Sequence, residues 1–271
     1  MNKLTTIIGA LFLIITSCSE NETKEPTNEN KNPLIKTIKE ISSTSALSTS
    51  FTYDGFKIKE ATTTGINVGQ FKIIYTYTGD FITQEDGYIN DILYVSNEYT
   101  YENNRLKTTI FKDTNSGTIS PPMNQTKLVY NYLSENIVDI DIYTYSNDWQ
   151  LNYSFPKVKV YFNGGNILKR EKFNSEGALI STINYEYDNS PNIYRNIIGF
   201  DKLFFINSFE NNFNRHFDIK DISNANNIKR IPSENEYYGY NYNLDGYPKE
   251  KLNYYNYSFG QYIIEKGYTY Y

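Results

Sequence analysis

The sequence predicts a mainly β protein: an antiparallel meander of hairpins that forms one large twisted or curled sheet with a short helical insertion. Three observations lead to this prediction. Apolar and polar residues alternate over many short stretches, as in Phe71–Tyr77, and such alternation places one set of side chains on each face of a strand. Turn-forming pairs recur between these stretches. The 271 residues include 28 Tyr and 16 Phe, and aromatic side chains suit a pleated, half-buried surface. A β-barrel or a β-sandwich is the alternative architecture.

Residues 1–17 have the pattern of an export signal. Lys3 is the early positive charge, and an apolar run extends from Leu4 to Thr16. This run is too short for a membrane-spanning helix, which needs about 20 apolar residues, and it fits the apolar region of a secretory signal peptide. We therefore expect residues 1–17 to be removed from the mature protein.

Cys18 is the single cysteine of the chain and directly follows this run, in the stretch Ile15-Thr16-Ser17-Cys18. The arrangement resembles the lipobox of bacterial lipoproteins, although Ile15 stands where that family usually has Leu. The resemblance implies cleavage before Cys18 and a membrane anchor of acyl chains, palmitate among them, on Cys18. Several acyl chains make a stable anchor, because each buried CH₂ contributes about 0.8 kcal/mol. An ordinary signal peptide followed by a free cysteine is the alternative.

Residues 18–33 are predicted to form a flexible tether. The acidic stretch Ser19–Glu25 resembles the tract that directs many lipoproteins of Bacteroidetes to the outer cell surface, and a polar, Asn-rich segment continues to Pro33. Acidic polar segments bury too little apolar surface to fold, so a generic solvated tether is the alternative. The resemblance implies an outer-membrane protein that faces the cell exterior.

Residues 34–271 are long enough for one β domain with a sizeable core. The domain repeats an aromatic residue, a tight polar turn, an apolar residue and a charged strand. The aromatic residues Tyr53, Tyr77 and Tyr101 follow one another at intervals of 24 residues, and Tyr132 and Phe162 follow at intervals of 31 and 30. Such an interval fits one hairpin plus its return loop. The Asp-Gly, Gly-Gly and Asn-rich pairs at the turns accept the positive φ that tight hairpins require.

The repeat unit is clearest in the stretch Tyr240-Asn241-Tyr242-Asn243-Leu244-Asp245-Gly246-Tyr247. This unit resembles the YD repeat of RHS-type surface proteins, in which such repeats build long β-sheet spirals. The mature chain more broadly resembles an uncharacterised family of YD-like lipoproteins from Bacteroidetes, with the best match between Tyr185 and Pro248. That family has no established activity, so the resemblance implies fold and location rather than chemistry.

Three segments depart from the repeat. Leu34–Ile41 could be a short helix or an edge strand, and Thr114–Thr126 is expected to be a long loop. The stretch from Asn192 to Ser233 is too long for a structureless loop in a compact domain. We expect it to contain a short helix near residues 199–210, and to cap one end of the sheet or to cover an open edge.

The composition argues against several function classes. One Cys and one His cannot supply an intrachain disulfide, a Cys-rich zinc site or a His cluster, and we expect no metal and no cofactor. The net charge of −5 argues against nucleic acid as a partner, because phosphate binding needs a basic face.

The candidate catalytic residues have simpler explanations. His216 is interpreted as a loop histidine, since no second His and no hydrolase motif accompanies it. Asp139 and Asp141 could suggest a glycosidase pair, but two carboxylates on one strand are more typical of a solvated strand face. The stretch Asn241–Asp245 imitates the start of a calcium loop, yet the twelfth position is Leu252 instead of Glu. We therefore expect no catalytic residue.

Aromatic clusters are the remaining candidates for binding. Tyr143, Tyr145 and Trp149 lie close together in the sequence, and further tyrosines crowd the carboxyl end. Most of these residues are expected to pair across strands, but exposed aromatic faces can stack on sugar rings or anchor a protein partner. Trp149, the single Trp beside a polar turn, is the residue that we select as a ligand contact.

These observations predict a non-enzymatic cell-envelope lipoprotein that is held in the membrane by a lipid anchor and binds a glycan or an envelope protein at the outer surface. A structural or assembly component of a surface complex is the alternative function. An enzymatic function is the least favoured hypothesis.

Overall fold

The computed structural model describes residues 32–42, 46–65, 68–113, 125–145, 148–152, 156–204, 223–257 and 260–271. They belong to a unit that spans Asn32–Tyr271 and separates from Met1–Lys31. The predicted signal peptide, Cys18, nearly all of the predicted tether and His216 therefore lie outside the described residues.

Eighteen β-strands make up nearly all of the regular structure in these ranges. The first nine are β1 (Ile35–Ile41), β2 (Ala46–Asp54), β3 (Lys57–Gly65), β4 (Val68–Thr78), β5 (Phe81–Ile89), β6 (Ile92–Glu102), β7 (Arg105–Asp113), β8 (Gln125–Tyr132) and β9 (Ile137–Tyr145). The others are β10 (Trp149–Leu151), β11 (Lys157–Asn163), β12 (Asn166–Phe173), β13 (Leu179–Asn184), β14 (Glu186–Pro191), β15 (Asn226–Ile231), β16 (Glu236–Tyr242), β17 (Pro248–Tyr257) and β18 (Gly260–Tyr270). Two 3₁₀ helices, η1 (Phe200–Lys202) and η4 (Pro232–Glu234), complete the described elements.

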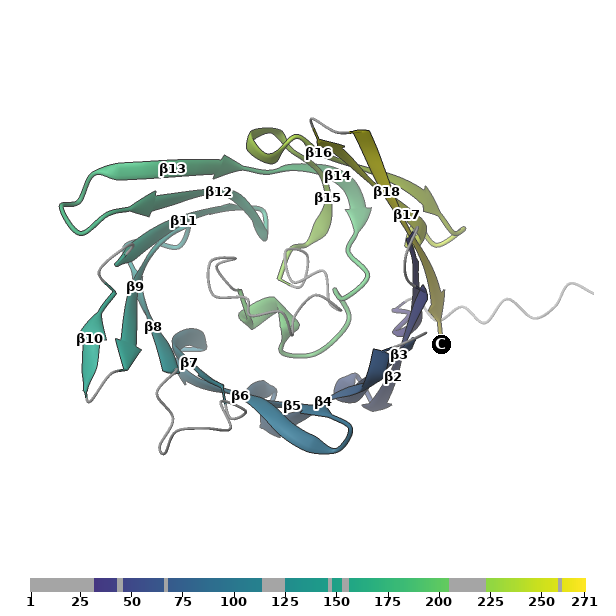
Figure 1. Cartoon of the computed structure of the whole chain (residues 1–271), viewed down its shortest axis with the longest axis horizontal. Helices are drawn as coiled ribbons and strands as arrows, with labels where there is room; N and C mark the ends of the chain where they lie inside the picture. Colours follow the sequence, from purple (N-terminus) through teal and green to yellow (C-terminus); the bar gives the residue numbers. More distant parts are fainter. Residues whose placement is uncertain are drawn as a thin grey trace, which may run out of the picture. The chain divides into compact units, whose positions relative to one another are not determined.

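The strands pair antiparallel around a nearly closed ring, as Figure 1 shows. From β1 the pairing follows the chain to β9, and then passes through β11 and β12 to β13. In the other direction it passes from β1 to β18 and returns through β17, β16 and β15 to β14. Only Tyr185 separates β13 from β14, and its amide donates to the carbonyl of Leu168 in β12. The predicted antiparallel β class is confirmed, in its barrel alternative.

The segment Leu34–Ile41, for which the sequence left two possibilities, forms strand β1. This strand pairs with β2 on one side and with β18 on the other, so it is not an edge strand. Its register places Ile35 opposite Tyr270, and the amide of Tyr271 donates to the carbonyl of Leu34. The first and last strands of the domain thus meet to close the ring.

Alternation of side chains separates a mainly apolar inner face from a more polar outer face. In β9 the inward side chains of Val138, Ile140 and Ile142 are fully buried, whereas Asp139 and Asp141 point outward. Inward residues from strands around the ring join one hydrophobic core. The burial of this apolar surface is the main favourable contribution to folding.

The first described part of the insertion between β14 and β15, residues 192–204, lies inside the ring of strands (Figure 1). This part buries Tyr194, Phe200 and Leu203. The ring of Phe200 lies 5.9 Å from that of Tyr75, and the ring of Phe204 lies 5.1 Å from that of Tyr130. Within the predicted range 199–210 the structure describes η1, a single 3₁₀ turn, and residues beyond 204 are outside the described ranges.

Gly199 allows this insertion to approach the barrel wall closely. It has a φ of +89°, which L side chains rarely adopt. A Cβ atom at this position would lie 3.1 Å from the carbonyl oxygen of Asp80 and from a carbon of Ile82. The amide of Ile198 donates to the carbonyl of Phe56, and the hydroxyl of Tyr77 donates to the carbonyl of Ile198. The insertion is therefore fixed to the turns that join β2 to β3 and β4 to β5.

A set of tyrosine side chains connects neighbouring strands at this end of the barrel, which we name the turn end. Each hydroxyl donates to a backbone carbonyl at the beginning of the strand beside it. The donors and acceptors are Tyr53 to Ile35 (2.7 Å), Tyr101 to Ile82 (2.7 Å), Tyr132 to Leu106 (3.0 Å), Tyr187 to Ile167 (2.6 Å), Tyr240 to Ile228 (2.9 Å) and Tyr270 to Pro248 (2.5 Å). We call these six residues the bridging tyrosines.

The bridging tyrosines explain the aromatic residue of the sequence repeat. Adjacent strands such as β5 and β6 are joined by a turn at the opposite end, so at the turn end nothing covalent holds them together. The tyrosine ring packs against the core while its hydroxyl satisfies a backbone acceptor that would otherwise be lost. Each bridge therefore joins one hairpin to the preceding one.

Removal of one bridging hydroxyl should measurably destabilise the barrel. Tyr101→Phe leaves the carbonyl of Ile82 without its donor, and an unsatisfied buried acceptor costs about 1–3 kcal/mol. Tyr161→Phe is the matched control, because the Tyr161 hydroxyl donates to the Glu171 carboxylate on the outer face, and it should change stability by less than about 0.5 kcal/mol. Urea unfolding of both variants measures the difference. Equal midpoints for the two variants would contradict the bridging role.

The barrel should also lose stability in alkaline solution. Burial raises the pKa of Tyr53, Tyr101 and Tyr270 well above the ordinary value of 10.0. The unfolded chain releases these protons near pH 10 and the folded chain does not, so this contribution to stability is present below about pH 10 and is lost as the pH rises further. The loss should reach up to about 1.4 kcal/mol per pH unit for each such tyrosine.

Urea midpoints at stepwise pH, recorded together with the ultraviolet absorbance of tyrosinate, test this expectation. Tyrosinate should form in step with unfolding. Complete titration of the tyrosines near pH 10 in a barrel that stays folded would show that burial does not protect them.

Candidate functional site

The wall of the barrel opens where β7 and β8 part. Their pairing ends at Thr108 opposite Val129, although β7 begins at Arg105 and β8 continues to Tyr132. The first three residues of β7 and the last three of β8 therefore lie opposite one another without a ladder. A hollow with a volume of about 530 Å³ lies there, which we call the slot. Its lining residues are Glu102, Asn103, Arg105, Leu106, Lys107, Tyr130, Asn131 and Tyr132.

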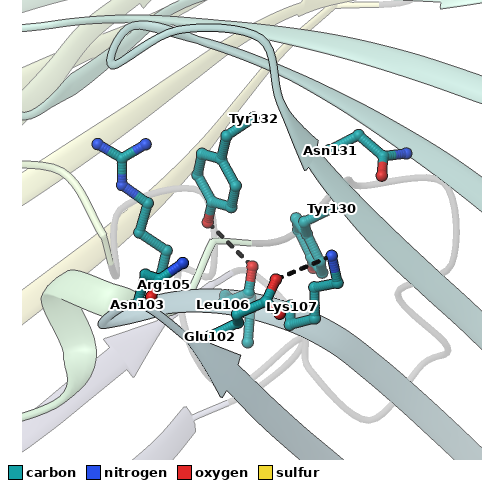
Figure 2. Close-up of a pocket in the computed structure, with 8 residues that line it drawn as sticks. All are labelled: Glu102, Asn103, Arg105, Leu106, Lys107, Tyr130, Asn131 and Tyr132. Carbon is teal, nitrogen blue, oxygen red and sulfur yellow. Dashed lines mark hydrogen bonds and ion pairs between the residues drawn. The ribbon is translucent and has the colours of Figure 1, made fainter.

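Two tyrosines hold the slot open (Figure 2). The Tyr132 hydroxyl donates to the Leu106 carbonyl, the acceptor that a continued ladder would use. The Tyr130 hydroxyl lies 3.2 Å from the Thr109 hydroxyl and donates to the carbonyl of Phe204 in the insertion, also at 3.2 Å. Tyr130 therefore links the slot to the insertion inside the barrel.

The turn between β6 and β7 forms one rim of the slot. Asn103 and Asn104 have φ angles of 52° and 61°, the left-handed conformation that a two-residue hairpin turn requires and that Asn tolerates well. This turn places Arg105 at the first position of β7, beside Tyr132. Figure 2 shows the two side chains next to each other.

Of the two basic residues that line the slot, one is paired with a carboxylate and the other contacts an aromatic ring. Lys107 forms an ion pair of 3.1 Å with Glu102. The Arg105 guanidinium lies 5.0 Å from the centre of the Tyr132 ring, a cation–π arrangement. Burial raises the pKa of Tyr132 to about 12, and the Arg105 charge and the Leu106 hydrogen bond oppose this rise. The Tyr132 hydroxyl therefore stays protonated at neutral pH.

Asn131 connects the slot to the outer face of the next strands. It lines the slot, and its side-chain amide donates to the Asp141 carboxylate of β9 at 2.8 Å. Beyond it lies an outer groove with a volume of about 360 Å³. The groove is lined by Asp139, Asp141, Leu151, Pro156, Lys157, Lys159, Phe173, Asn174, Ser175 and Gly177.

The two carboxylates that the sequence analysis considered lie in this groove. Lys157 approaches Asp139 at 3.5 Å and Asp141 at 3.7 Å, and Lys159 approaches Asp139 at 3.6 Å. The lysines come from β11, directly opposite the aspartates in the ladder. The carboxylates are thus part of an outward ion-pair network on adjacent strands, and they do not face each other across a cleft.

Trp149 lies at the edge of the same outer face. Its ring is 5.3 Å from that of Tyr145 in an edge-on arrangement, and the Lys127 ammonium lies 4.6 Å from its ring. Trp149 is half-buried and belongs to neither the slot nor the outer groove. The structure thus joins Trp149 to Tyr145, as their proximity in the sequence suggests, but does not bring it to the slot.

Two further hollows border the insertion at the turn end. One, of about 600 Å³, is lined by residues of the β4–β5 turn and of the insertion, among them Asp80, Arg195 and Asp201. The other, of about 420 Å³, includes Gly164, Arg195 and Asp201. Asp201 is paired with Lys202 at 2.6 Å, and Arg195 donates to the carbonyl of Ala225. Both contacts lie within the insertion and stabilise its own conformation.

One carboxylate is buried inside the barrel. Glu85 accepts hydrogen bonds from the Tyr99 hydroxyl at 2.6 Å and from the Asn97 amide at 3.3 Å. Burial raises the pKa of Glu85 above its ordinary range, and the two hydrogen bonds partly offset the rise. Since these bonds connect β5 to β6, the group contributes to the structure of the interior.

Within the described ranges no three His, Cys, Asp or Glu side chains are grouped so that they could hold a metal ion. The described part of the chain also has no helix that is long and apolar enough to cross a membrane. His216 and Cys18 fall outside it, and so do the side chains of Tyr255 and Tyr257 at the carboxyl end.

The sequence analysis missed Arg105, Asn131 and Tyr132 as a group. One signal was available: the interval from Tyr101 to Tyr132 is 31 residues, whereas the two preceding intervals are 24. The longer interval reflects the longer connection between β7 and β8, which end and begin at Asp113 and Gln125; the ladders of β3 with β4 and of β5 with β6 also stop short of the turn end. Only the register of strand pairing shows that Arg105, Asn131 and Tyr132 line the gap between β7 and β8.

The fold and the slot define an antiparallel β-barrel with a polar hollow in its wall. A solved structure of a porin-like protein from Bacteroides vulgatus is similar to this chain, with a TM-score of 0.53 at 11% identity over 88% of this chain and 99% of that one. A porin-like protein from Bacteroides uniformis gives a TM-score of 0.48 at 10% identity over 87% and 95% of the two chains. No family model and no curated protein matches the sequence. The first likeness supports the barrel fold.

Proposed function

We propose that this chain is a cell-envelope lipoprotein, non-enzymatic, whose barrel binds a glycan in the slot between β7 and β8. The observation that carries the proposal is the slot itself, where two strands leave their backbone edges unpaired beside two tyrosines, two amide side chains and a guanidinium. The resemblances of the amino terminus to a lipoprotein signal and of the body to YD-repeat surface proteins support the location.

The composition of the slot suits a polyhydroxylated ligand. Its volume of about 530 Å³ falls in the range of small-molecule sites, about 300–1,000 Å³. Asn103 and Asn131 offer both donors and acceptors to sugar hydroxyls, and the tyrosine rings offer apolar faces to the carbon skeleton of a sugar.

The outer face supports attachment to a membrane by a lipid anchor. A barrel embedded in lipid needs an outward apolar band, but several outward side chains of β9, β11 and β12 here form ion pairs. Examples are Lys157 with Asp139 and Lys169 with Glu171. Such a surface is compatible with exposure to water. The acyl chains on Cys18 would therefore anchor the protein to the outer membrane, and the barrel would face the cell exterior.

Docking of an envelope protein is a second candidate function. Leu151, Leu179 and Ile180 are more than half exposed, and they lie on β10 and β13, near one end of the outer groove. Trp149 adds an aromatic side chain to this region, and Trp is frequent at the energetic centre of protein interfaces. This surface would suit an accessory role in a surface complex.

Replacement of Cys18 tests the anchor. Cys18→Ala should release the protein from the membrane fraction or leave it unprocessed, because the acylated thiol is lost. Ser17→Ala keeps a small residue before Cys18 and serves as the control. Detergent partition and labelling with a fatty-acid probe measure both variants, and unchanged membrane retention of Cys18→Ala would contradict the lipoprotein assignment.

A glycan array tests the slot. Asn131→Ala should weaken binding of any captured glycan by about tenfold, which corresponds to the loss of one or two hydrogen bonds. Asn241→Ala is the matched control, because Asn241 also donates to a carboxylate on the next strand, Glu250, at 2.8 Å, but lies outside the slot. An array without any captured glycan, or equal losses in the two variants, would refute glycan binding in the slot.

A further inference from the structure

The slot contains one positive charge that no carboxylate among the described residues neutralises. Lys107 is paired with Glu102, and Asp139 and Asp141 on the neighbouring strand are approached by lysines of β11. Arg105 makes its described contact with the Tyr132 ring, and within the described ranges it forms no ion pair. The lining of the slot thus carries one surplus positive charge.

The N–H groups of Arg105 are available for a ligand. The guanidinium lies 5.0 Å from the centre of the Tyr132 ring, and within the described ranges its N–H groups donate to no protein acceptor. The Tyr132 hydroxyl is already bound to the Leu106 carbonyl, so it does not compete for these donors. The planar N–H fork matches the two oxygens of a carboxylate better than it matches a single hydroxyl.

We infer that the slot selects an acidic glycan, one that presents the carboxylate of a uronic acid to Arg105. The inference rests on the proposed glycan-binding function and specifies its ligand. Asn103 and Asn131 would bind the hydroxyls of the same sugar ring. The chain as a whole is acidic, with a net charge of −5, so long-range attraction of polyanions is weak and selection depends on this local contact.

The test compares two probes, methyl β-glucuronide and methyl β-glucoside, which differ at one carbon that is a carboxylate in the first and an alcohol in the second. Titrations followed by NMR should show tighter binding of the glucuronide by at least about tenfold, the effect of one charge-assisted hydrogen-bonded pair. Added salt should reduce this preference.

Substitutions test whether Arg105 is the source of the preference for glucuronide. Arg105→Gln should abolish the preference for glucuronide, and Arg105→Lys should restore only part of it, because a lysine keeps the charge but lacks the fork. Arg230→Gln is the matched control with the same change of charge. The Arg230 guanidinium also lies near a tyrosine, 4.9 Å from the centre of the Tyr237 ring, but it is far from the slot in the ladder and has Glu186 as a partner. It should leave the preference unchanged.

The outcomes distinguish the acidic-glycan inference from the proposed glycan-binding function on which it rests. Equal binding of the two probes, or a preference that persists in Arg105→Gln, would overturn the acidic-glycan inference and leave glycan binding intact. Binding of a short acidic peptide as tightly as the glucuronide would overturn it in favour of a protein ligand. Failure of both sugars to bind wild-type protein, together with an empty array, would overturn the proposed function as well.

Discussion

The barrel depends on the bond between a tyrosine hydroxyl and a backbone carbonyl at the turn end. Hairpins hold their own strands together, but neighbouring hairpins meet at this end without a covalent connection. The bridging tyrosines join them, from Tyr53 at the start of the ring to Tyr270 at its close. Tyrosine suits this position because its ring belongs in the core and its hydroxyl satisfies a carbonyl that burial would otherwise penalise. Six of the 28 tyrosines of the chain therefore have a direct role in the architecture.

The same bond accounts for the candidate site. Between β7 and β8 the bridge persists, from Tyr132 to Leu106, while the ladder ends at Thr108 and Val129. A tyrosine that occupies the carbonyl of a ladder position can hold two strands beside each other without letting them pair. The wall stays connected by this contact and yet has a polar hollow, which is the site of the proposed ligand binding. Arg105, 5.0 Å from the centre of the same ring, contributes a positive charge to the hollow.

Local signals in the sequence predicted the class of fold, whereas the closure of the sheet depended on distant contacts. Period-two alternation and turn pairs such as Asn103-Asn104 are readable in a few residues. The pairing of Ile35 with Tyr270 closes the ring, and no local pattern predicts it. Trp149 was chosen for its rarity and lies on the outer face beside Tyr145. Arg105 and Asn131 look like ordinary turn and strand residues until the register shows that they face a gap.

Hydrogen–deuterium exchange of the backbone amides tests the central claim most directly, because amides without ladder partners exchange far faster than paired ones. Arg105 and Leu106 also pair with β6, and Tyr130–Tyr132 with β9, so only the amides that point toward the gap lack a partner. We predict rapid exchange of those gap-facing amides in Arg105–Lys107 and Tyr130–Tyr132, against slow exchange in the segments Thr108–Ile110 and Leu128–Val129, which are paired across β7 and β8. The fast segments should slow when an acidic sugar is bound. Uniform protection along β7 and β8 in the free protein would contradict the account, since it would mean that the wall is closed where the slot is placed.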